Sequence, residues 1–143
     1  MSHLKFVLLI IPLCALAYGH PDIESPEQLL WENRIVMIWA DGQVGSRQML
    51  DAAGAEIEDR DVVWFVIDGL NVTSNYRGEI ADHFVTVANQ KYAGLSKKVV
   101  LLGKDGGVKY TSDELRLDVL FQEIDSMPMR KNEMKFRGSK GSF

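Results

Sequence analysis

The side chains best suited to polar chemistry lie in three short segments of the sequence. The first segment, WADGQVGS (39–46), follows an apolar run and precedes an amphipathic run, so it is predicted to be a strand-to-helix turn. Redox proteins often hold a reactive cysteine in such a turn, because the N–H groups at a helix N-terminus stabilise a thiolate. This turn holds Asp41 and Ser46 but no cysteine. We expect it to bind a small anion or to be capped by one of these side chains, since the sequence places no base such as His83 beside Ser46.

The second segment, GKDGGVKY (103–110), has the glycine content of a phosphate-binding loop. It lacks the Walker spacing and the Lys-Ser/Thr pair, and it lies between two predicted strands rather than before a helix. The dipeptide Asp105-Gly106 instead predicts a hairpin turn, because both residue types tolerate positive φ. Lys104 and Lys109 flank this turn and are candidate contacts for an anion, together with Asp105.

The third segment, IDSMPMRKNEM (124–134), places Asp125 and Arg130 around two methionines and a proline. In one interpretation the methionines fill gaps in the core and Arg130 pairs with a nearby carboxylate. In the other, the segment lines a surface groove where Arg130 receives an anion or a carboxylate of a partner. The sequence alone leaves both interpretations open.

Metal and cofactor sites are not predicted. If residues 1–19 are removed as a signal peptide, as argued below, His20 becomes the N-terminal residue and could chelate copper through its amine and its ring. Only His83 would then remain as a second imidazole. The acidic residues near position 27 do not have the spacing of a calcium loop. We therefore expect no bound metal and no cofactor.

The N-terminal segment has the pattern of a secretory signal. Lys5 precedes an apolar stretch that ends at Ala17, and small residues occupy positions 17 and 19. The stretch is shorter than the roughly 20 residues that span a bilayer. Cleavage before His20 would remove Cys14, the single cysteine, and leave no disulfide, no thiolate nucleophile and no membrane span. We therefore expect a periplasmic or secreted protein with a signal peptide at 1–19, one domain at 20–134 and a basic flexible tail at 135–143.

Charge is distributed unevenly along the chain. Residues 20–129 contain 10 basic and 19 acidic side chains, whereas residues 130–143 contain five basic side chains and one acidic side chain. An acidic body is a poor partner for nucleic acid, so nucleic-acid binding is not expected.

The pattern of apolar residues predicts an α/β domain. Near-continuous apolar runs at 34–40, 61–68 and 97–103 are typical of strands that are covered on both faces. Helical spacing occurs at 46–58 and at 78–94, and a last helix is predicted from a cap at Ser112 or Asp113 to a stop at Pro128. Right-handed crossovers would make the first three strands parallel, and the hairpin at 103–110 would add an antiparallel edge. The expected fold is thioredoxin-like, with a mixed sheet of about four strands and helices on both faces.

The segments RDVVWFVID, LLGKDGGVKY and LFQEIDSMPMRKNEM, in this order and spacing, resemble an exported family of unknown function (DUF4174 type). The resemblance covers roughly residues 26–134. It implies a peroxiredoxin-like or thioredoxin-like fold and a relation to domains in secreted sushi-repeat and matrix proteins. It implies no established catalytic residue. The positions that match the family's signature are Arg60, Asp61, Gly103, Lys104, Asp105, Gly106, Lys109, Asp125, Met127, Pro128, Arg130 and Glu133.

These observations favour a binding or interaction module that lacks thiol chemistry and recognises an unidentified protein or a small anionic ligand. The candidate binding residues are Asp41, Ser46, Lys104, Asp105, Lys109, Asp125 and Arg130. Two alternatives stay open. One is an enzyme that works without cysteine, through the polar loop of Asp41 and Ser46 at the first helix or through Asp125 with Arg130. The other is a purely structural envelope protein.

Overall fold

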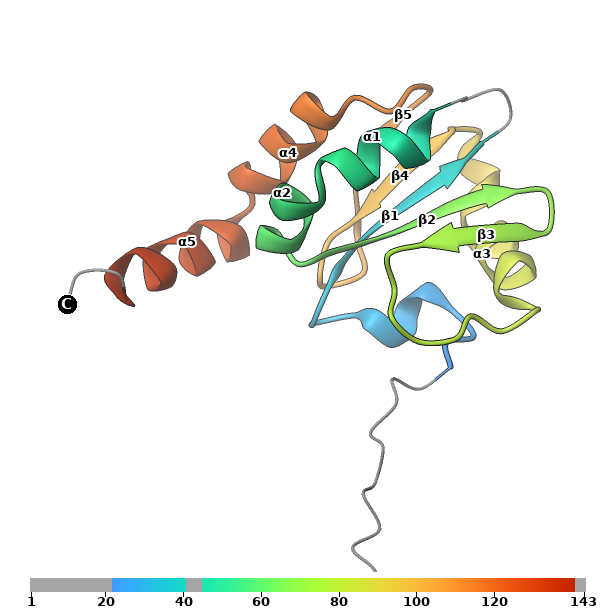
Figure 1. The fold of residues 1–143 in the computed structure, drawn as a ribbon, viewed down its shortest axis with the longest axis horizontal. Coiled ribbons are helices and arrows are strands. Elements are labelled where there is room, and N and C mark those ends of the chain that lie inside the picture. Colours follow the sequence, from blue (N-terminus) through green and yellow to red (C-terminus); the bar gives the residue numbers. More distant parts are fainter. Residues whose placement is uncertain (1–21, 41–44, 141–143) are drawn as a thin grey trace, which may run out of the picture.

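A computed structural model describes residues 22–40 and 45–140 (Figure 1). The expected signal peptide, Cys14, His20 and Asp41 lie outside these residues. The elements follow in the order η1 (Pro26–Leu29), β1 (Arg34–Trp39), α1 (Ser46–Ala52), α2 (Gly54–Asp59), β2 (Val62–Asp68), β3 (Asn71–Ser74), α3 (Phe84–Tyr92), η2 (Ala93–Leu95), β4 (Val99–Leu102), β5 (Val108–Ser112), α4 (Leu117–Ser126) and α5 (Pro128–Lys140).

The described part of the chain forms one mixed sheet with the strand order β3-β2-β1-β4-β5. The three apolar runs of the sequence form its central strands β1, β2 and β4, as predicted. β1 and β2 are parallel, with Arg34 opposite Val62. β4 is antiparallel to β1, so the prediction of three parallel strands is wrong. Apolar runs show that a strand is buried on both faces, but they carry no information about its direction.

The sheet has five strands rather than about four, because β3 was not predicted. β3 pairs with β2 as an antiparallel hairpin, with Asp68 opposite Asn71. Gly69 lies in the turn at φ +59, a conformation that glycine adopts without strain. The side chains of β3 are only partly buried, so the strand lacks the apolar pattern that marks its neighbours. At the other edge, β4 and β5 form the predicted hairpin around Gly106, which has φ +82.

Helices cover both faces of the sheet, which gives a three-layer α/β architecture (Figure 1). One face carries η1 and α3, and its core includes Met37, Phe65 and Phe84. The other face carries α1, α2 and α4, and its core includes Trp64, Leu101 and Ile124. Successive residues of β1, β2 and β4 alternate between the two cores, which explains why their sequences are apolar throughout.

Three predicted helices differ in extent from the structure. The helix predicted at 46–58 is divided into α1 and α2, with Gly54, a weak helix former, at the start of the second. The helix predicted at 78–94 begins only at Phe84, because Ile80 forms a β-bridge with Ile23. The helix predicted to follow Ser112 or Asp113 is α4. It begins at Leu117 and is not capped by either residue, since Ser112 belongs to β5.

Pro128 ends α4 as predicted, and it also begins α5. Met127 between the two helices is extended, the conformation that a following proline favours. Proline is favoured at the first position of a helix, because its fixed φ suits the helix and no N–H is needed there. α5 continues to Lys140, so residues 135–140, expected in a flexible tail, are helical. Within the described ranges no helix is long and apolar enough to cross a membrane.

Candidate functional site

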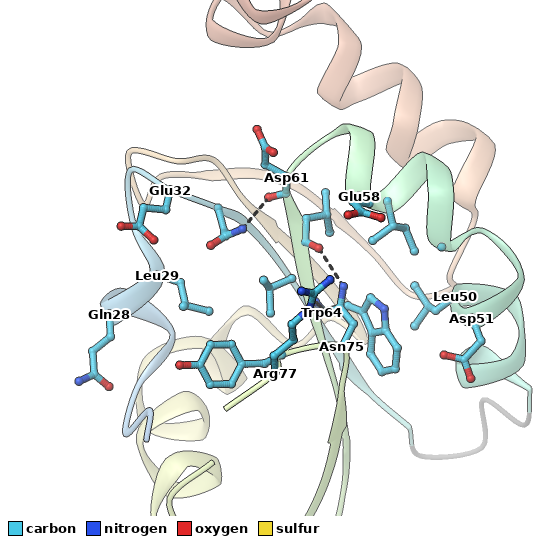
Figure 2. A pocket seen from close by; sticks show the side chains of 16 residues that line it. Gln28, Leu29, Glu32, Leu50, Asp51, Glu58, Asp61, Trp64, Asn75 and Arg77 are labelled. Carbon is cyan, nitrogen blue, oxygen red and sulfur yellow. Dashed lines mark hydrogen bonds between the residues drawn. The ribbon is translucent and has the colours of Figure 1, made fainter. Parts of the chain in front are cut away.

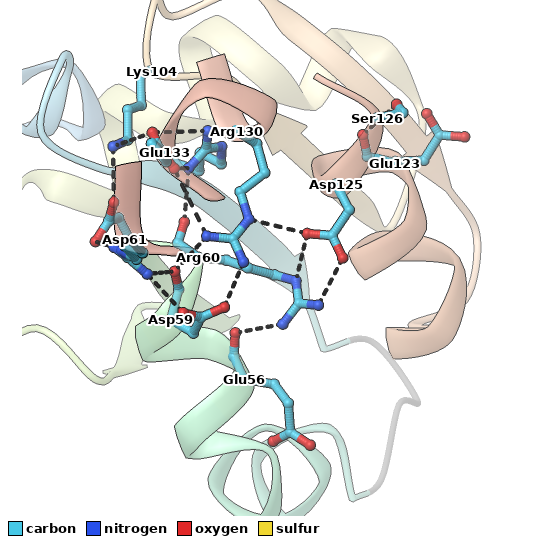
Figure 3. A network of polar contacts seen from close by, with 12 residues as sticks. Glu56, Asp59, Arg60, Asp61, Lys104, Glu123, Asp125, Ser126, Arg130 and Glu133 are labelled. Carbon is cyan, nitrogen blue, oxygen red and sulfur yellow. Dashed lines mark hydrogen bonds and ion pairs between the residues drawn. The ribbon is translucent and has the colours of Figure 1, made fainter. Parts of the chain in front are cut away.

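Charged side chains gather at the end of the sheet where β1 and β2 begin and β4 ends (Figure 3). We call this cluster the charged network. Its members are Arg34 of β1, Asp59 of α2, Arg60 and Asp61 before β2, Lys104 after β4, Asp125 of α4, and Arg130, Glu133 and Arg137 of α5. Six of these nine residues match signature positions of the family that the sequence resembles.

The carboxylate of Glu133 is the centre of the most buried part of the charged network. Arg34 donates to both of its oxygens, at 3.1 and 3.2 Å, and Lys104 Nζ lies 2.8 Å from Oε1. The side chain of Arg34 is 1% exposed and that of Lys104 is 10% exposed. Partial burial raises the pKa of Glu133, but the hydrogen bonds from Arg34 and Lys104 outweigh burial and hold the pKa below its ordinary value.

Asp125 connects α4 to α2 and α5. Arg60 donates to both carboxylate oxygens, from Nε at 3.0 Å and from Nη2 at 2.7 Å, and Arg130 Nε donates to Oδ1 at 3.1 Å. Partial burial raises the pKa of Asp125, but these arginines lower it further than burial raises it. The guanidinium of Arg60 also lies 4.5 Å from the centre of the Phe121 ring. This arrangement fixes the bidentate geometry that arginine and carboxylate prefer.

Asp59 and Asp61 flank Arg60 and receive the remaining contacts of α5. Arg130 and Arg137 both contact the Asp59 carboxylate, and the hydrogen bond from Arg130 is the main cause of its lowered pKa. Asp61 accepts from Lys104 Nζ at 2.9 Å and lies 3.5 Å from Arg137. Its backbone has φ +51, and its carbonyl accepts the N–H of Arg34 at 2.9 Å.

α5 therefore attaches to the body of the domain through charged side chains. Arg130, Glu133 and Arg137 are spaced at i, i+3 and i+7, so they lie on one face of the helix. Arg130 is the one residue of α5 that is fully buried. The cations and carboxylates of the charged network pair with one another, and Arg34 Nε is the one buried side-chain nitrogen or oxygen of the described residues without a hydrogen-bond partner. An external anion would have to displace Glu133, Asp59 or Asp125 to reach the buried cations.

The binding residues predicted from the sequence lie, where the structure describes them, in three different parts of it. Lys104, Asp125 and Arg130 meet in the charged network, where they pair with carboxylates and cations of the chain itself. Asp105 and Lys109 form their own ion pair at 2.9 Å in the turn between β4 and β5, and the hydrogen bond from Lys109 lowers the pKa of Asp105. Ser46 is buried at the first residue of α1.

A cleft of about 710 Å³ lies beside the charged network (Figure 2). We call it the edge cleft, because it follows the part of β2 that β3 leaves uncovered. β3 pairs with Phe65 to Asp68, and the first three residues of β2 have no strand on that side. The residues that line the edge cleft come from four segments: Gln28, Leu29, Glu32 and Asn33; Leu50, Asp51, Gly54, Ile57 and Glu58; Asp61, Val62, Val63 and Trp64; and Asn75, Tyr76 and Arg77.

The side chain of Asn75 replaces the missing strand in the edge cleft. The N–H of Trp64 donates to Asn75 Oδ1 at 2.8 Å, and Asn75 Nδ2 donates to the carbonyl of Val62 at 3.0 Å. Backbone groups at a sheet edge must find a partner in the protein or in water. Asn75 satisfies two of them while occupying less space than a strand, and this leaves room for the cleft.

The edge cleft combines an apolar floor with an acidic rim. Leu50, Ile57 and Trp64 are buried, and their side chains belong to the core beneath α1 and α2. The lining contains four carboxylates, those of Glu32, Asp51, Glu58 and Asp61, and one cation, Arg77. Asp61 is paired with Lys104, which belongs to the charged network and does not line the cleft. The cleft and the network thus share Asp61.

Sequence reasoning did not identify the edge cleft. Its lining residues come from segments between 28 and 77, and neither Glu32 nor Glu58 stands in a recognisable motif. No group of histidine, cysteine or carboxylate side chains within 22–40 and 45–140 could hold a metal ion. The hairpin signal Asp68-Gly69, which places Asn75 beside β2, was the one available indication of this site.

The architecture and the site define an α/β domain with a mixed sheet, a charged network at one end of that sheet and a cleft at its uncovered edge. The family model described as a domain of unknown function (DUF4174) matches residues 25–133, and the chain belongs to this family. The match includes every lining residue of the edge cleft and all of the charged network except Arg137. No curated protein and no solved structure matched the sequence.

Proposed function

We propose that this chain is an exported, periplasmic or secreted binding module that performs no thiol chemistry. The pattern of the first nineteen residues supports export. The sole cysteine, Cys14, falls within that segment. A thioredoxin-like relation is supported by the order of elements, with α1 following the strand β1, a parallel β1–β2 pair and a terminal β4–β5 hairpin.

The observation that carries the proposal is the edge cleft. Its volume of about 710 Å³ falls within the range of roughly 300–1,000 Å³ typical of small-molecule sites. It combines a buried apolar floor with polar groups at the rim, as ligand sites do. The charged network, by contrast, pairs its acids and bases with one another and holds α5 in place, so we assign it a structural role.

A catalytic alternative has less support. It depends on the polar loop before α1, where Ser46 would need to be reached by a substrate and by a base. Ser46 is only 4% exposed, and Asp41 lies outside the described residues. We therefore propose binding rather than catalysis as the activity of this domain.

The proposal is tested by filling the edge cleft. Gly54 lines the cleft, and a Cβ built there meets no atom within 4 Å, so Gly54→Phe can start a ring at this position without displacing a neighbouring atom. Gly94 in η2 is also open and does not line the cleft, which makes Gly94→Phe the matched control. Both variants and the wild type are incubated with extract of the native envelope, and bound molecules are identified by mass spectrometry.

We expect the wild type and Gly94→Phe to retain the same ligand and Gly54→Phe to lose it. Equal retention by all three proteins would show that binding, if present, does not use the edge cleft. Thiol–disulfide exchange is measured in parallel with the purified mature chain. Dithiol oxidoreductase activity in that assay would overturn the proposal.

A further inference from the structure

The edge cleft carries information about the charge of its ligand. Glu32 and Glu58 form no ion pair within residues 22–40 and 45–140. Asp51 has one partner, Arg47, at 3.5 Å, and both side chains are more than half exposed. An exposed pair of this kind contributes little and is easily exchanged for another cation. Three carboxylates of the cleft are thus available to a ligand.

The opposite charge is scarce in the edge cleft. Arg77 is the one cation among its lining residues. Lys104 and Arg137 act on the fourth carboxylate, Asp61, from outside the cleft. The lining therefore keeps an excess of negative charge, and a cationic ligand is favoured over an anionic one.

The floor of the edge cleft indicates the rest of the ligand. Leu29, Ile57 and Trp64 line the floor and are 7%, 2% and 3% exposed, so each offers a small apolar surface to a ligand, and Leu50 lies on the same side as Ile57 and Trp64. A bare metal ion gains nothing from such a floor, and the described residues offer no group of metal ligands. Apolar surface is stabilised by an apolar ligand group, at roughly 25 cal/mol for each Å² removed from water.

The exposed indole of Trp31, which directly precedes the cleft residue Glu32 in the chain, is consistent with a cationic ligand. Trp31 directly precedes the cleft residues Glu32 and Asn33, and it is 69% exposed. Its backbone has φ +70, which is strained for a bulky side chain. The N–H of Trp31 donates to the carbonyl of Lys104 at 2.7 Å, which fixes this conformation. The fold accepts this strain and leaves in solvent an indole, the side chain whose face attracts organic cations most strongly.

We propose that the edge cleft binds a small organic cation, an amine or a guanidinium with an apolar body. The charged group of the ligand is attracted by the acidic rim, to which Glu32, Glu58 and Asp51 contribute, and its apolar part lies over the floor formed by Leu50, Ile57 and Trp64. This inference rests on the proposed function, because it names the ligand class of the same cleft.

The experiment uses three probes of one shape and different charge: 4-phenylbutylamine, 4-phenylbutanol and 4-phenylbutanoate. Binding to the purified protein is followed by two-dimensional NMR, with the indole N–H of Trp64 and the side-chain amide of Asn75 as reporters. We expect the amine to shift both reporters and to bind about tenfold more tightly than the alcohol, as two weak ion pairs would provide. The carboxylate probe should bind most weakly of the three.

The paired variant Glu32→Gln with Glu58→Gln should lower the affinity for the amine about tenfold and leave the affinity for the alcohol unchanged. Glu79→Gln with Glu114→Gln is the matched control, since it makes the same change in net charge at exposed carboxylates outside the cleft. This control should bind the amine as the wild type does.

Two results would overturn the inference, and they have different consequences. If the alcohol or the carboxylate shifts the reporters at concentrations as low as the amine does, the ligand class is wrong and the cleft remains a binding site. If none of the probes shifts the reporters and Gly54→Phe also retains the envelope ligand, both the ligand class and the proposed site fail.

Discussion

The charged network and the edge cleft are neighbours that use charge in opposite ways. In the network, the cations Arg34, Arg60, Lys104, Arg130 and Arg137 meet the carboxylates Asp59, Asp61, Asp125 and Glu133. In the cleft, Glu32 and Glu58 have no ionic partner among the described residues, and Arg77 is the one lining cation. Asp61 belongs to both regions.

The difference between the two regions shows that one domain can hold the same residue types both in buried, paired positions and in exposed positions without an ionic partner. Buried charges must be paired, because removal from water costs several kcal/mol for each ion. Where Arg34 and Arg130 are buried, each has carboxylate partners, and together these pairs fix α5 to the sheet. At the rim of the cleft Glu32 and Glu58 are exposed to solvent, so their carboxylates need no internal partner.

The largest expected effect comes from breaking the most buried pair of the charged network. Arg34→Met removes both hydrogen bonds to Glu133 and the one to the carbonyl of Arg60. Glu133 is then left, in a partly buried position, with Lys104 at 2.8 Å and the more distant Arg130 at 3.9 Å. We expect a loss of about 3–5 kcal/mol in the free energy of unfolding, as for other buried pairs that lose one partner. Urea denaturation of the variant and the wild type measures this loss.

The control for this prediction removes both charges. Arg34→Met combined with Glu133→Leu replaces the pair by apolar groups of similar size, which is often neutral or stabilising. We expect the double variant to recover most of the lost stability. A loss below about 1 kcal/mol in the single variant would show that this pair behaves as an exposed salt bridge does.

A smaller effect is expected when Glu133 loses its charge at low pH. The pKa of Glu133 is lower in the folded protein than its ordinary value of 4.5, so its ionised form stabilises the fold. This contribution is complete above about pH 4.5 and is lost as the pH falls through the lowered pKa. The difference in stability between the wild type and Glu133→Gln should be constant from pH 7 to about pH 5 and should shrink below that range.

Glu27 provides a comparison outside the charged network. Burial raises its pKa, but hydrogen bonds from Lys91 and Tyr92 at 2.6 and 2.7 Å lower it to about 2. The stabilising effect of Glu27, measured with Glu27→Gln, should therefore begin to decline below about pH 4.5 and disappear only near pH 2. If the effect of Glu133→Gln stayed constant down to pH 3, the charge of Glu133 would have no part in holding α5.

The sequence predicted the central strands better than their directions or the edges of the sheet. Continuous apolar runs identified β1, β2 and β4, because only strands covered on both faces need such runs. The direction of β4 depends on how α3 crosses the sheet, and no local pattern records that path. The Asp-Gly signal was recognised at Asp105-Gly106 and missed at Asp68-Gly69, where the exposed β3 gave no second signal.

The two regions of the site also differ in how far they could be predicted. Lys104, Asp125 and Arg130 were recognised as candidates, and one interpretation paired Arg130 with a nearby carboxylate, as the structure shows. Arg34 was not recognised, since a cation at the start of an apolar run normally lies at the surface. The edge cleft depends on the absence of a strand beside Val62 and Trp64, and a missing pairing leaves no pattern in the sequence.

The uncovered edge of β2 should be sensitive to Asn75. Asn75→Ala leaves the N–H of Trp64 and the carbonyl of Val62 without their partners. We expect a loss of about 1–2 kcal/mol in the free energy of unfolding, within the range for unsatisfied backbone groups that water can partly reach. Asn71→Ala, an exposed change in the adjacent strand β3, is the control and should cost less than about 0.5 kcal/mol. Equal losses of stability in the two variants would show that the hydrogen bonds of Asn75 to Val62 and Trp64 do not stabilise the edge of β2.

The smallest effect on stability is expected in the edge cleft, and it should have the opposite sign. Glu58→Gln removes a carboxylate that lies among other acids and has no ion pair in the described part of the chain. Loss of this repulsion should raise the free energy of unfolding by up to about 0.5 kcal/mol, whereas Glu133→Gln lowers it. The same substitution type thus stabilises at one site and destabilises at the other. Urea denaturation at low salt resolves this sign, and added salt should reduce the gain, because screening weakens interactions between exposed charges. A loss of stability in Glu58→Gln would mean that Glu58 has a structural partner, and the contrast between paired and available charges would no longer hold.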